Sequence, residues 1–375
     1  MSKPGHIGVN ACLVAASIAA TLFFIEVSLR LTQHPLLESA YVYWRRATYE
    51  SFFFHNAICP GLSIGVLGRV EDGRGRLGHC RPPEEPPRNF HAVRGWTDFS
   101  IRRIPDGHLI EDLTGAPWRG TQYVPYAKTR RRVILIGDSF IYGWNVAMDE
   151  TIDRLLSVRL GDEVEVVTLG TRGYGLDQMV LVANEVIPQL SPDDVALGFI
   201  ADDLVRSCEN FSNSGQAAKP RFELKDGRLI SPSALPTPYE NYLRHREPHT
   251  LDAILARLYS VRVLALAMGP LLRGAQETCI SKLNAALLGS LMKDWSQKTR
   301  VRLVHLDGVL PAEFMTEMAG LNIPYYSAPA DIAATSQGLG VTADRHADGH
   351  PKAGLNAIYA FMIYKILDSS PAAPP

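Results

Sequence analysis

The chain has 375 residues, of which 46% are hydrophobic, so it can bury a substantial core and does not have the composition of a disordered protein. Its 38 basic and 39 acidic residues leave a formal net charge of −1. Because nucleic-acid binding depends on neutralising phosphates with an excess of positive charge, this balance argues against a nucleic-acid partner.

The N-terminal segment is predicted to be a membrane anchor, which we place at residues 1–30. Residues 7–25 carry no charge, and this run is close to the ~20 residues that cross a bilayer as a helix. It ends in bulky apolar residues rather than a small-residue cleavage site, which favours an uncleaved anchor over a signal peptide. One lysine precedes the segment and several arginines follow it, a pattern that by itself would leave the following side in the cytoplasm.

Residues 31–129 are rich in Pro, Gly and Arg and contain only short apolar pieces. We interpret them as a linker that leads into a small β-rich cap. The five cysteines of the chain are too few and too scattered for a disulfide scaffold or a paired-cysteine zinc site. If two of them pair, we expect Cys59 and Cys80, which both lie in this loop-rich region. The alternative is that all five are free.

Beyond residue 130 strands alternate with helices, which indicates βαβ units and a parallel sheet. The first strand has no alternation of polar and apolar residues, as expected of a strand buried on both faces. The predicted fold is therefore α/β, a three-layer doubly wound parallel sheet of about five strands over residues 130–370. The expected strands are 133–136, 164–168, 195–200, 301–306 and 324–326, and the expected helices are 149–161, 174–190, 281–299 and 351–367.

An insertion at about 204–250 interrupts this alternation. Within it, Lys225-Asp226-Gly227 lies between two short apolar pieces and predicts a hairpin turn. An insertion near the carboxyl end of a strand is a place where substrate selectivity is expected.

The first strand ends in Gly137-Asp138-Ser139. A serine at a strand-to-helix turn lies near unpaired backbone N–H groups that favour developing negative charge, so it can serve as a nucleophile. The alternative is that Asp138 or Ser139 merely caps the helix.

The second strand is followed by a glycine-rich turn that contains Gly170, Gly173 and Gly175. Glycine permits positive φ and close approach of the backbone, so the Gly173 N–H could point at an oxyanion. The turn also resembles a phosphate-binding loop, but no Lys-Ser/Thr pair follows, which argues against a nucleotide site.

The third strand is followed by the paired carboxylates Asp202 and Asp203. Adjacent acids at a strand end could bind a metal, cap a helix or belong to an active site. Because no other ligand lies nearby in the sequence, we favour capping.

The last motif, at residues 344–354, precedes a helix that starts near Pro351. This placement puts His350 at the helix cap, where it can act as a general base for a serine if a carboxylate orients its ring. The metal alternative uses His346 and His350 with Asp344 and Asp348. We disfavour it because four-residue histidine spacing needs a helix, and the nearby glycine and proline argue against one.

Together these four motifs resemble the SGNH (GDSL-like) hydrolase superfamily in order and spacing, over residues 130–370. The resemblance implies that Ser139 is the nucleophile and that its own N–H and that of Gly173 contribute to the oxyanion hole. It implies His350 as the base and Asp348 as its orienting partner, with no metal and no organic cofactor. The N-terminal segment and the insertion are also similar to those of membrane-anchored bacterial members.

Two departures from the family pattern matter. Asp202 stands where the family has an Asn that donates a third hydrogen bond to the oxyanion, and an ionised carboxylate has no proton to donate. Loss of one such donor costs about 10²- to 10³-fold in rate. Either burial keeps Asp202 protonated, Asn210 substitutes, or the enzyme is slow. In addition, the Asp-x-His spacing is shorter than usual, which leaves Asp344 as a reserve for Asp348.

The first functional prediction is a serine esterase or deacetylase that hydrolyses O-acetyl or other short-chain acyl esters through an acyl-enzyme on Ser139. The second is an O-acyltransferase that passes the same acyl group to an envelope polysaccharide. The third, motivated by Asp202, is a membrane-anchored binding protein on a degenerate scaffold. The resemblance and the anchor predict a periplasmic catalytic domain. The sequence assigns neither a natural substrate nor an oligomeric state.

Overall fold

The computed structural model describes residues 90–114, 120–209, 219–232, 234–235 and 278–368, together with the short strands β1 (Ser63–Ile64) and β2 (Val70–Glu71). The chain divides into two compact units. One comprises Met1–Pro82 and Glu240–Ala275, and in it β1 and β2 pair antiparallel. The other, Pro83–Tyr239 with Gln276–Pro375, contains the candidate site.

The predicted anchor at 1–30 lies outside the described residues. Among the residues that are described, no helix is both long and apolar enough to cross a membrane. The proposed boundaries of the anchor, the cap and the insertion stay predictions.

A sheet of five parallel strands forms the centre of the second unit, which confirms the predicted α/β class and parallel sheet. Its spatial order is β14-β13-β10-β8-β9, so the first strand of the sheet, β8, lies between the second and the third. In such a doubly wound sheet ligands bind at the carboxyl ends of the strands where the winding reverses, here between β8 and β10. The strands are β8 (Arg131–Gly137), β9 (Val164–Gly170), β10 (Asp194–Ile200), β13 (Arg300–Asp307) and β14 (Tyr326–Ser327).

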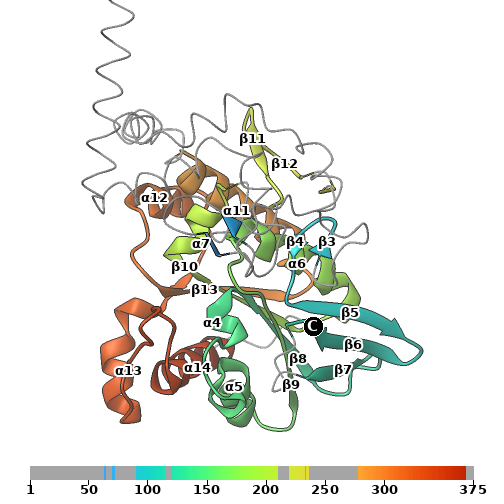
Figure 1. Cartoon of the computed structure of the whole chain (residues 1–375), viewed down its shortest axis with the longest axis vertical. Helices are drawn as coiled ribbons and strands as arrows, with labels where there is room; N and C mark the ends of the chain where they lie inside the picture. The colour runs from blue at the N-terminus through green and yellow to red at the C-terminus, as the bar shows by residue number, and fades with distance from the viewer. Residues whose placement is uncertain are drawn as a thin grey trace, which may run out of the picture. The chain divides into compact units, whose positions relative to one another are not determined.

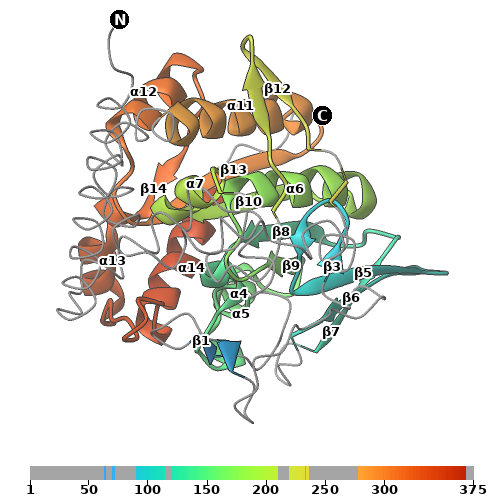
Figure 2. The same ribbon diagram turned by 45° about the horizontal axis from the view of Figure 1, so that its top comes forward.

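Helices cover both faces of this sheet (Figures 1 and 2). Alternate side chains of β8 explain why: Val133 and Leu135 pack into the cluster that includes α5 (Ile152–Leu160) and α14 (Ala353–Asp368). Ile134 and Ile136 pack into the opposite cluster, which includes α6 (Leu176–Leu190) and α11 (Asn284–Trp295). The continuous apolar run of β8 is therefore buried on both sides. The shorter helices are α4 (Ser139–Tyr142), α7 (Ala201–Arg206), α12 (Ala312–Gly320) and α13 (Ile332–Leu339).

An antiparallel meander precedes the parallel sheet, within the region expected to hold a β-rich cap. It consists of β5 (Phe99–Ile104), β6 (Gly107–Asp112) and β7 (Thr121–Pro125), and it follows the short pair β3 (Phe90–His91) and β4 (Gly95–Trp96). One residue from each strand of the meander, Phe99, Ile110 and Val124, joins the apolar cluster on the α6 side. The meander thus shares a core with the parallel sheet.

The predicted hairpin in the insertion is confirmed. Strands β11 (Glu223–Lys225) and β12 (Arg228–Ile230) pair antiparallel with Lys225 opposite Arg228. The two turn residues both have positive φ, 51° at Asp226 and 72° at Gly227. This is the backbone twist that two-residue hairpin turns need and that Asp-Gly supplies.

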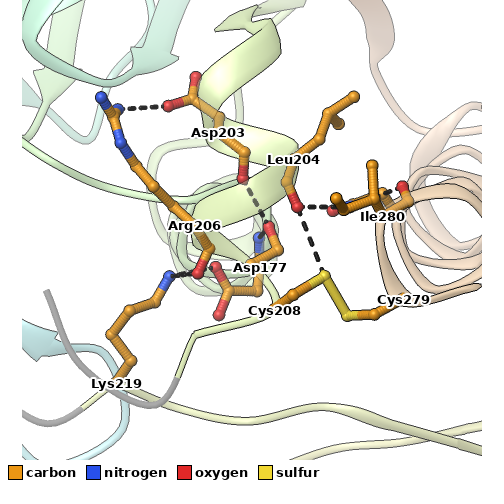
Figure 3. Close-up of a disulfide and its surroundings, with 10 residues drawn as sticks. Asp177, Asp203, Leu204, Arg206, Cys208, Lys219, Cys279 and Ile280 are labelled. Atoms are coloured by element: carbon orange, nitrogen blue, oxygen red, sulfur yellow. Dashed lines mark hydrogen bonds and ion pairs between the residues drawn. A yellow bond between two sulfur atoms is a disulfide. The ribbon is translucent and has the colours of Figure 1, made fainter. Parts of the chain in front are cut away.

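A disulfide joins Cys208, just after α7, to Cys279, which begins a π-helical turn (Cys279–Leu283) before α11 (Figure 3). The alternative that all five cysteines are free is therefore wrong. Cys59 and Cys80 lie outside the described residues, so their pairing stays untested. The two bonded cysteines are 71 residues apart, and α7 contacts the π-helical turn that contains Cys279.

Candidate active site

Ser139 is the first residue of α4, directly after the carboxyl end of β8, and it is 6% exposed. Asp138 is the cap of this helix, because its Oδ1 accepts a hydrogen bond from the Phe140 N–H at 2.9 Å. Gly137 makes the turn possible: a Cβ there would lie 2.6 Å from the Gly198 carbonyl oxygen. The capping role considered for either residue thus falls to Asp138, whose Oδ2 is also within 3.4 Å of the Ser139 hydroxyl as an acceptor.

His350 lies in the loop before α14, and its Nε2 is 2.8 Å from Ser139 Oγ. The two residues are 211 positions apart in the chain, so the fold itself creates this contact. A hydroxyl that donates to Nε2 requires the tautomer in which Nδ1 carries the proton. In that state Nε2 can accept the serine proton, which is the geometry that general-base catalysis needs.

Asp348 lies beside the other nitrogen of the ring. Its Oδ2 is 3.2 Å from His350 Nδ1, an ion-pair distance, but Nδ1 has no hydrogen-bond partner among the described residues. Asp348 Oδ2 instead accepts a hydrogen bond from Asn145 Nδ2 at 2.7 Å, and Oδ1 accepts from the His350 backbone N–H at 3.2 Å. The reserve carboxylate, Asp344, accepts from the Thr342 hydroxyl. Of the two acids, Asp348 is the one positioned at the imidazole.

The Asp348 carboxylate is 44% exposed, whereas the His350 side chain is 21% exposed. Slight desolvation acts to raise the pKa of Asp348. The His350 backbone N–H and the imidazole beside it outweigh that effect and hold the pKa below its usual value. Asp348 is therefore a charged group on the solvent side of the imidazole.

The glycine-rich turn after β9 packs against the nucleophile turn. The Thr171 N–H donates to the Gly137 carbonyl at 3.0 Å, and a Cβ on Gly170 would lie 2.3 Å from the Tyr142 backbone nitrogen. Gly173, the predicted second oxyanion donor, has φ of +74°, a left-handed conformation that favours glycine. The turn is thus fixed beside α4 with its backbone in the conformation that the sequence predicted glycine to provide.

Asp202 and Asp203 have different environments. Asp203 is fully buried, and its Oδ2 accepts from the Ile200 N–H at 2.8 Å, so it caps α7 as the sequence favoured. Asp202 is exposed, so the buried Asp202 considered in the sequence analysis is not observed. Asn210, the suggested substitute donor, lies outside the described residues. A third oxyanion donor is not identified within the part of the chain that the structure describes.

Arg206, at the end of α7, was not identified from the sequence. Its Nη1 lies 2.6 Å from Asp203 Oδ1 and 3.2 Å from Asp138 Oδ2, and it donates to the Tyr174 carbonyl at 3.3 Å. Figure 3 shows the contact with Asp203. The only sequence signal was the three-residue spacing of Asp203 and Arg206, which pairs opposite charges on a helix.

Burial raises the pKa of both carboxyls that Arg206 contacts. For Asp138 the nearby guanidinium opposes the effect of burial. For Asp203 the charge of Asp138 adds to burial, and its pKa lies well above the usual value. The two acids and Arg206 therefore form one cluster of charged groups next to Ser139.

The β-rich segment holds the glycine-rich turn from the other side. Asp98 accepts hydrogen bonds from the backbone N–H of Arg172 and from its guanidinium, at 2.8 to 2.9 Å. The Trp96 indole donates to the Arg172 carbonyl, and the Tyr174 hydroxyl donates to the Trp96 carbonyl, both at 2.9 Å. The residues on both sides of Gly173 are thus anchored to strands that precede the parallel sheet, a role of the cap region that the sequence did not reveal.

A cavity of about 310 Å³ lies between the meander and the end of β9. Its lining includes Asp98, Asp112, Gln122, Tyr142 and Thr168, but neither Ser139 nor His350. The cavity therefore neighbours the helix that carries the nucleophile without containing the Ser139–His350 pair.

The alternative metal site of the sequence analysis used His346 and His350 with Asp344 and Asp348. Within the described ranges, no group of three or more His, Cys, Asp or Glu side chains is arranged to hold a metal ion. That includes these four side chains, of which Asp348 and His350 face each other instead as a candidate catalytic pair.

No protein-family profile matches the chain, and no curated protein matches its sequence. Among solved structures, it is similar to a member of the lipolytic protein G-D-S-L family from Veillonella parvula, at 12% identity and a TM-score of 0.36, over 64% of this chain and 100% of that one. A carbohydrate acetylesterase from Sinorhizobium meliloti (10% identity, TM-score 0.32) and an aryl esterase from M. smegmatis (12%, 0.32) each align over 64% of this chain and 99% of their own. At these scores the likeness assigns neither a family nor an activity.

Proposed function

We propose that the protein is a serine esterase or deacetylase that cleaves short acyl esters through an acyl-enzyme on Ser139. The observation that carries the proposal is the 2.8 Å contact between Ser139 Oγ and His350 Nε2 at the carboxyl ends of the parallel strands. A buried hydroxyl and an imidazole in this contact, with a carboxylate at the far side of the ring, are the groups that acyl transfer needs.

In the proposed reaction, Ser139 Oγ attacks the carbonyl carbon of the ester while His350 Nε2 accepts the hydroxyl proton. The N–H groups of Ser139 and Gly173 stabilise the oxyanion of the tetrahedral intermediate. Its collapse breaks the ester C–O bond, and His350 returns the proton to the leaving alcohol. Water then attacks the acyl-enzyme with His350 again as base, which releases the carboxylic acid and restores Ser139.

Deacylation by a sugar hydroxyl in place of water would make the same site an O-acyltransferase. The steps up to the acyl-enzyme are identical, so the acceptor alone separates the two activities. A carbohydrate that lowers the yield of free acid and becomes acylated would establish transfer. A carbohydrate that leaves the yield unchanged supports hydrolysis.

We place the catalytic unit outside the cytoplasm, anchored by the N-terminal segment. The Cys208–Cys279 disulfide supports this location, because such bonds persist in oxidising compartments such as the periplasm. A reporter that is active only outside the cytoplasm, fused after residue 375, should be active. Activity of a reporter restricted to the cytosol would overturn the placement.

The test of the activity is hydrolysis of short-chain aryl esters by the full-length protein in detergent, beside Ser139→Ala. Turnover should vanish in this variant and persist in Ser290→Ala, a matched change on α11 away from the site. Absence of turnover in folded wild-type protein, with no acyl transfer to a carbohydrate, would favour the binding-protein alternative that the exposed Asp202 raises.

A further inference from the structure

One nitrogen of Arg206 contacts the segments that follow β8, β9 and β10, the third of which is helix α7. Nη1 contacts Asp138 in the first, the Tyr174 carbonyl in the second and Asp203 in the third. Two of these partners are immediate chain neighbours of the proposed oxyanion donors, since Asp138 precedes Ser139 and Tyr174 follows Gly173. Nη1 therefore links the residues next to the two donor N–H groups, so its position affects the distance between those N–H groups.

The same cluster places charge beneath the nucleophile. Asp138 and Asp203 are fully buried, and Asp138 Oδ2 lies 3.4 Å from Ser139 Oγ. A buried carboxylate without a partner would repel the negative charge that develops on the serine and the oxyanion during attack. The guanidinium of Arg206, itself only 13% exposed, compensates this charge.

The backbone of Arg206 is also held in place, through its carbonyl oxygen, as Figure 3 shows. The Lys219 ammonium donates to the Arg206 carbonyl at 2.6 Å and pairs with buried Asp177 at 3.0 Å. Two residues further along the chain, Cys208 is bonded to Cys279. These contacts fix the end of α7, so the guanidinium approaches the loops from a defined direction.

We propose that Arg206 is a positioning residue that sets the spacing of the oxyanion donors and neutralises the carboxylates beneath Ser139. This inference rests on the proposed function for its catalytic consequence. Arg206 does not face the substrate in this account, since its guanidinium lies among the loops that carry the donors. Its removal should therefore change kcat while leaving KM nearly constant.

The kinetic test compares Arg206→Met with Arg206→Lys in full-length protein. The Met variant should lose about 10²-fold in kcat, the scale seen when one oxyanion donor is lost. Lysine keeps a charge and three donors at a single nitrogen, so Arg206→Lys should stay within about tenfold of wild type. Equal losses in the two variants, or a loss confined to KM, would contradict the proposal.

A double variant separates positioning from a simple folding defect. Asn in place of Asp203 can still accept from the Ile200 N–H, so Arg206→Met with Asp203→Asn removes a carboxylate together with its partner. The kcat of the double variant should be at least about tenfold higher than that of Arg206→Met, because the double variant no longer has an unpaired buried charge at position 203. No recovery in a folded double variant would count against charge compensation.

A second readout does not depend on turnover. Removing Arg206 takes away a positive charge near the imidazole, and whatever negative charge Asp138 retains is then uncompensated, so the midpoint of the His350 titration should move to higher pH. NMR titration of full-length Ser139→Ala, with and without Arg206→Met, measures this shift, with exposed Arg103→Met as the control. The charged groups around the imidazole are Asp348 and His346 of its own loop, Asp138 of the nucleophile turn, and Arg345 with its partner Asp307.

The two readouts distinguish the two proposals. A shifted midpoint in a protein that hydrolyses no ester would retain the role of Arg206 and overturn the proposed activity. An unchanged midpoint together with kcat within about threefold of wild type in Arg206→Met would overturn the role of Arg206, whatever the activity of the wild type.

Discussion

The two halves of the candidate site are held in different ways. The nucleophile half is buried: Asp138 and Asp203 have no exposed surface, and Arg206 ties them to the loop after β9. The base half lies at the surface, with Asp348 held through Asn145 and through the backbone of its own loop. Buried ion pairs are costly to break, whereas exposed ones contribute little. Changes in the first half should therefore affect folding and rate together, and changes in the second should affect mainly the rate.

The largest effect is expected from His350→Gln. Glutamine occupies similar space but cannot accept and return a proton, so kcat for aryl esters should fall by at least about 10³-fold. Thermal unfolding should stay close to that of wild type because His350 is only partly buried and the change leaves no unpaired buried charge. Substantial unfolding at the assay temperature would contradict the contrast between the two halves.

Lys219→Met tests the buried half. Both Lys219 and Asp177 are fully buried, and burial raises the pKa of Asp177 while the Lys219 charge opposes it. Removing the ammonium leaves an unpaired buried carboxylate, and the free energy of unfolding should drop by roughly 3–5 kcal/mol. Denaturant melts of Lys219→Met and of the double variant with Asp177→Asn measure this, and the double variant should be the more stable. A single variant as stable as wild type would show that this support is unnecessary.

A smaller effect is expected from Asp348→Asn. Loss of a buried, hydrogen-bonded triad carboxylate costs about 10⁴-fold. Because Asp348 is 44% exposed and makes no hydrogen bond to Nδ1, we expect a loss in kcat of only about 10- to 10²-fold. Asp344→Asn is the matched control and should be nearly neutral. A loss as large as that of His350→Gln would mean that the imidazole and Asp348 tighten together when substrate binds.

The smallest effects concern pH and stability, and they have opposite signs in the two halves. The pKa of Asp203 is raised by burial, so its contribution to stability is present below the unfolded value near pH 4 and is lost as pH rises through the folded value. The pKa of Asp348 is lowered, so its contribution is present above the unfolded value and is lost as pH falls. The Tm of Asp203→Asn relative to wild type should thus increase from pH 4 to 8. The Tm of Asp348→Asn relative to wild type should decrease slightly as the pH rises to about 4 and change little above it. If the Tm difference from wild type changed with pH in the same direction for both variants, the assignment of a buried and an exposed half would be contradicted.

The sequence predicted those features that depend on local pattern. The continuous run of apolar residues in β8 identified a strand buried on both faces, and Asp226-Gly227 identified a hairpin turn. The glycine-rich turn and the position of His350 before a helix followed from the conformations that glycine and proline favour. Such features need only neighbouring residues to be interpreted.

Other features depended on contacts across the fold. Nothing local indicates that Cys208 meets Cys279, that Arg206 contacts the turns after β8 and β9, or that Asp98 fixes Arg172. The acidic pair shows the limit most clearly, since adjacent and identical residues have opposite environments: Asp203 is buried as a cap, and Asp202 is exposed. Their order on one helical turn decides which faces the core.

The most direct test of the account is covalent labelling of the full-length protein with a fluorophosphonate, followed by peptide mapping. The probe forms a stable adduct only with a serine that is activated for attack. We predict a single adduct on Ser139 that disappears in Ser139→Ala and is strongly slowed in His350→Gln. Folded wild-type protein that resists the probe, or an adduct that persists in Ser139→Ala, would contradict the claim that Ser139 and His350 form a working nucleophile and base.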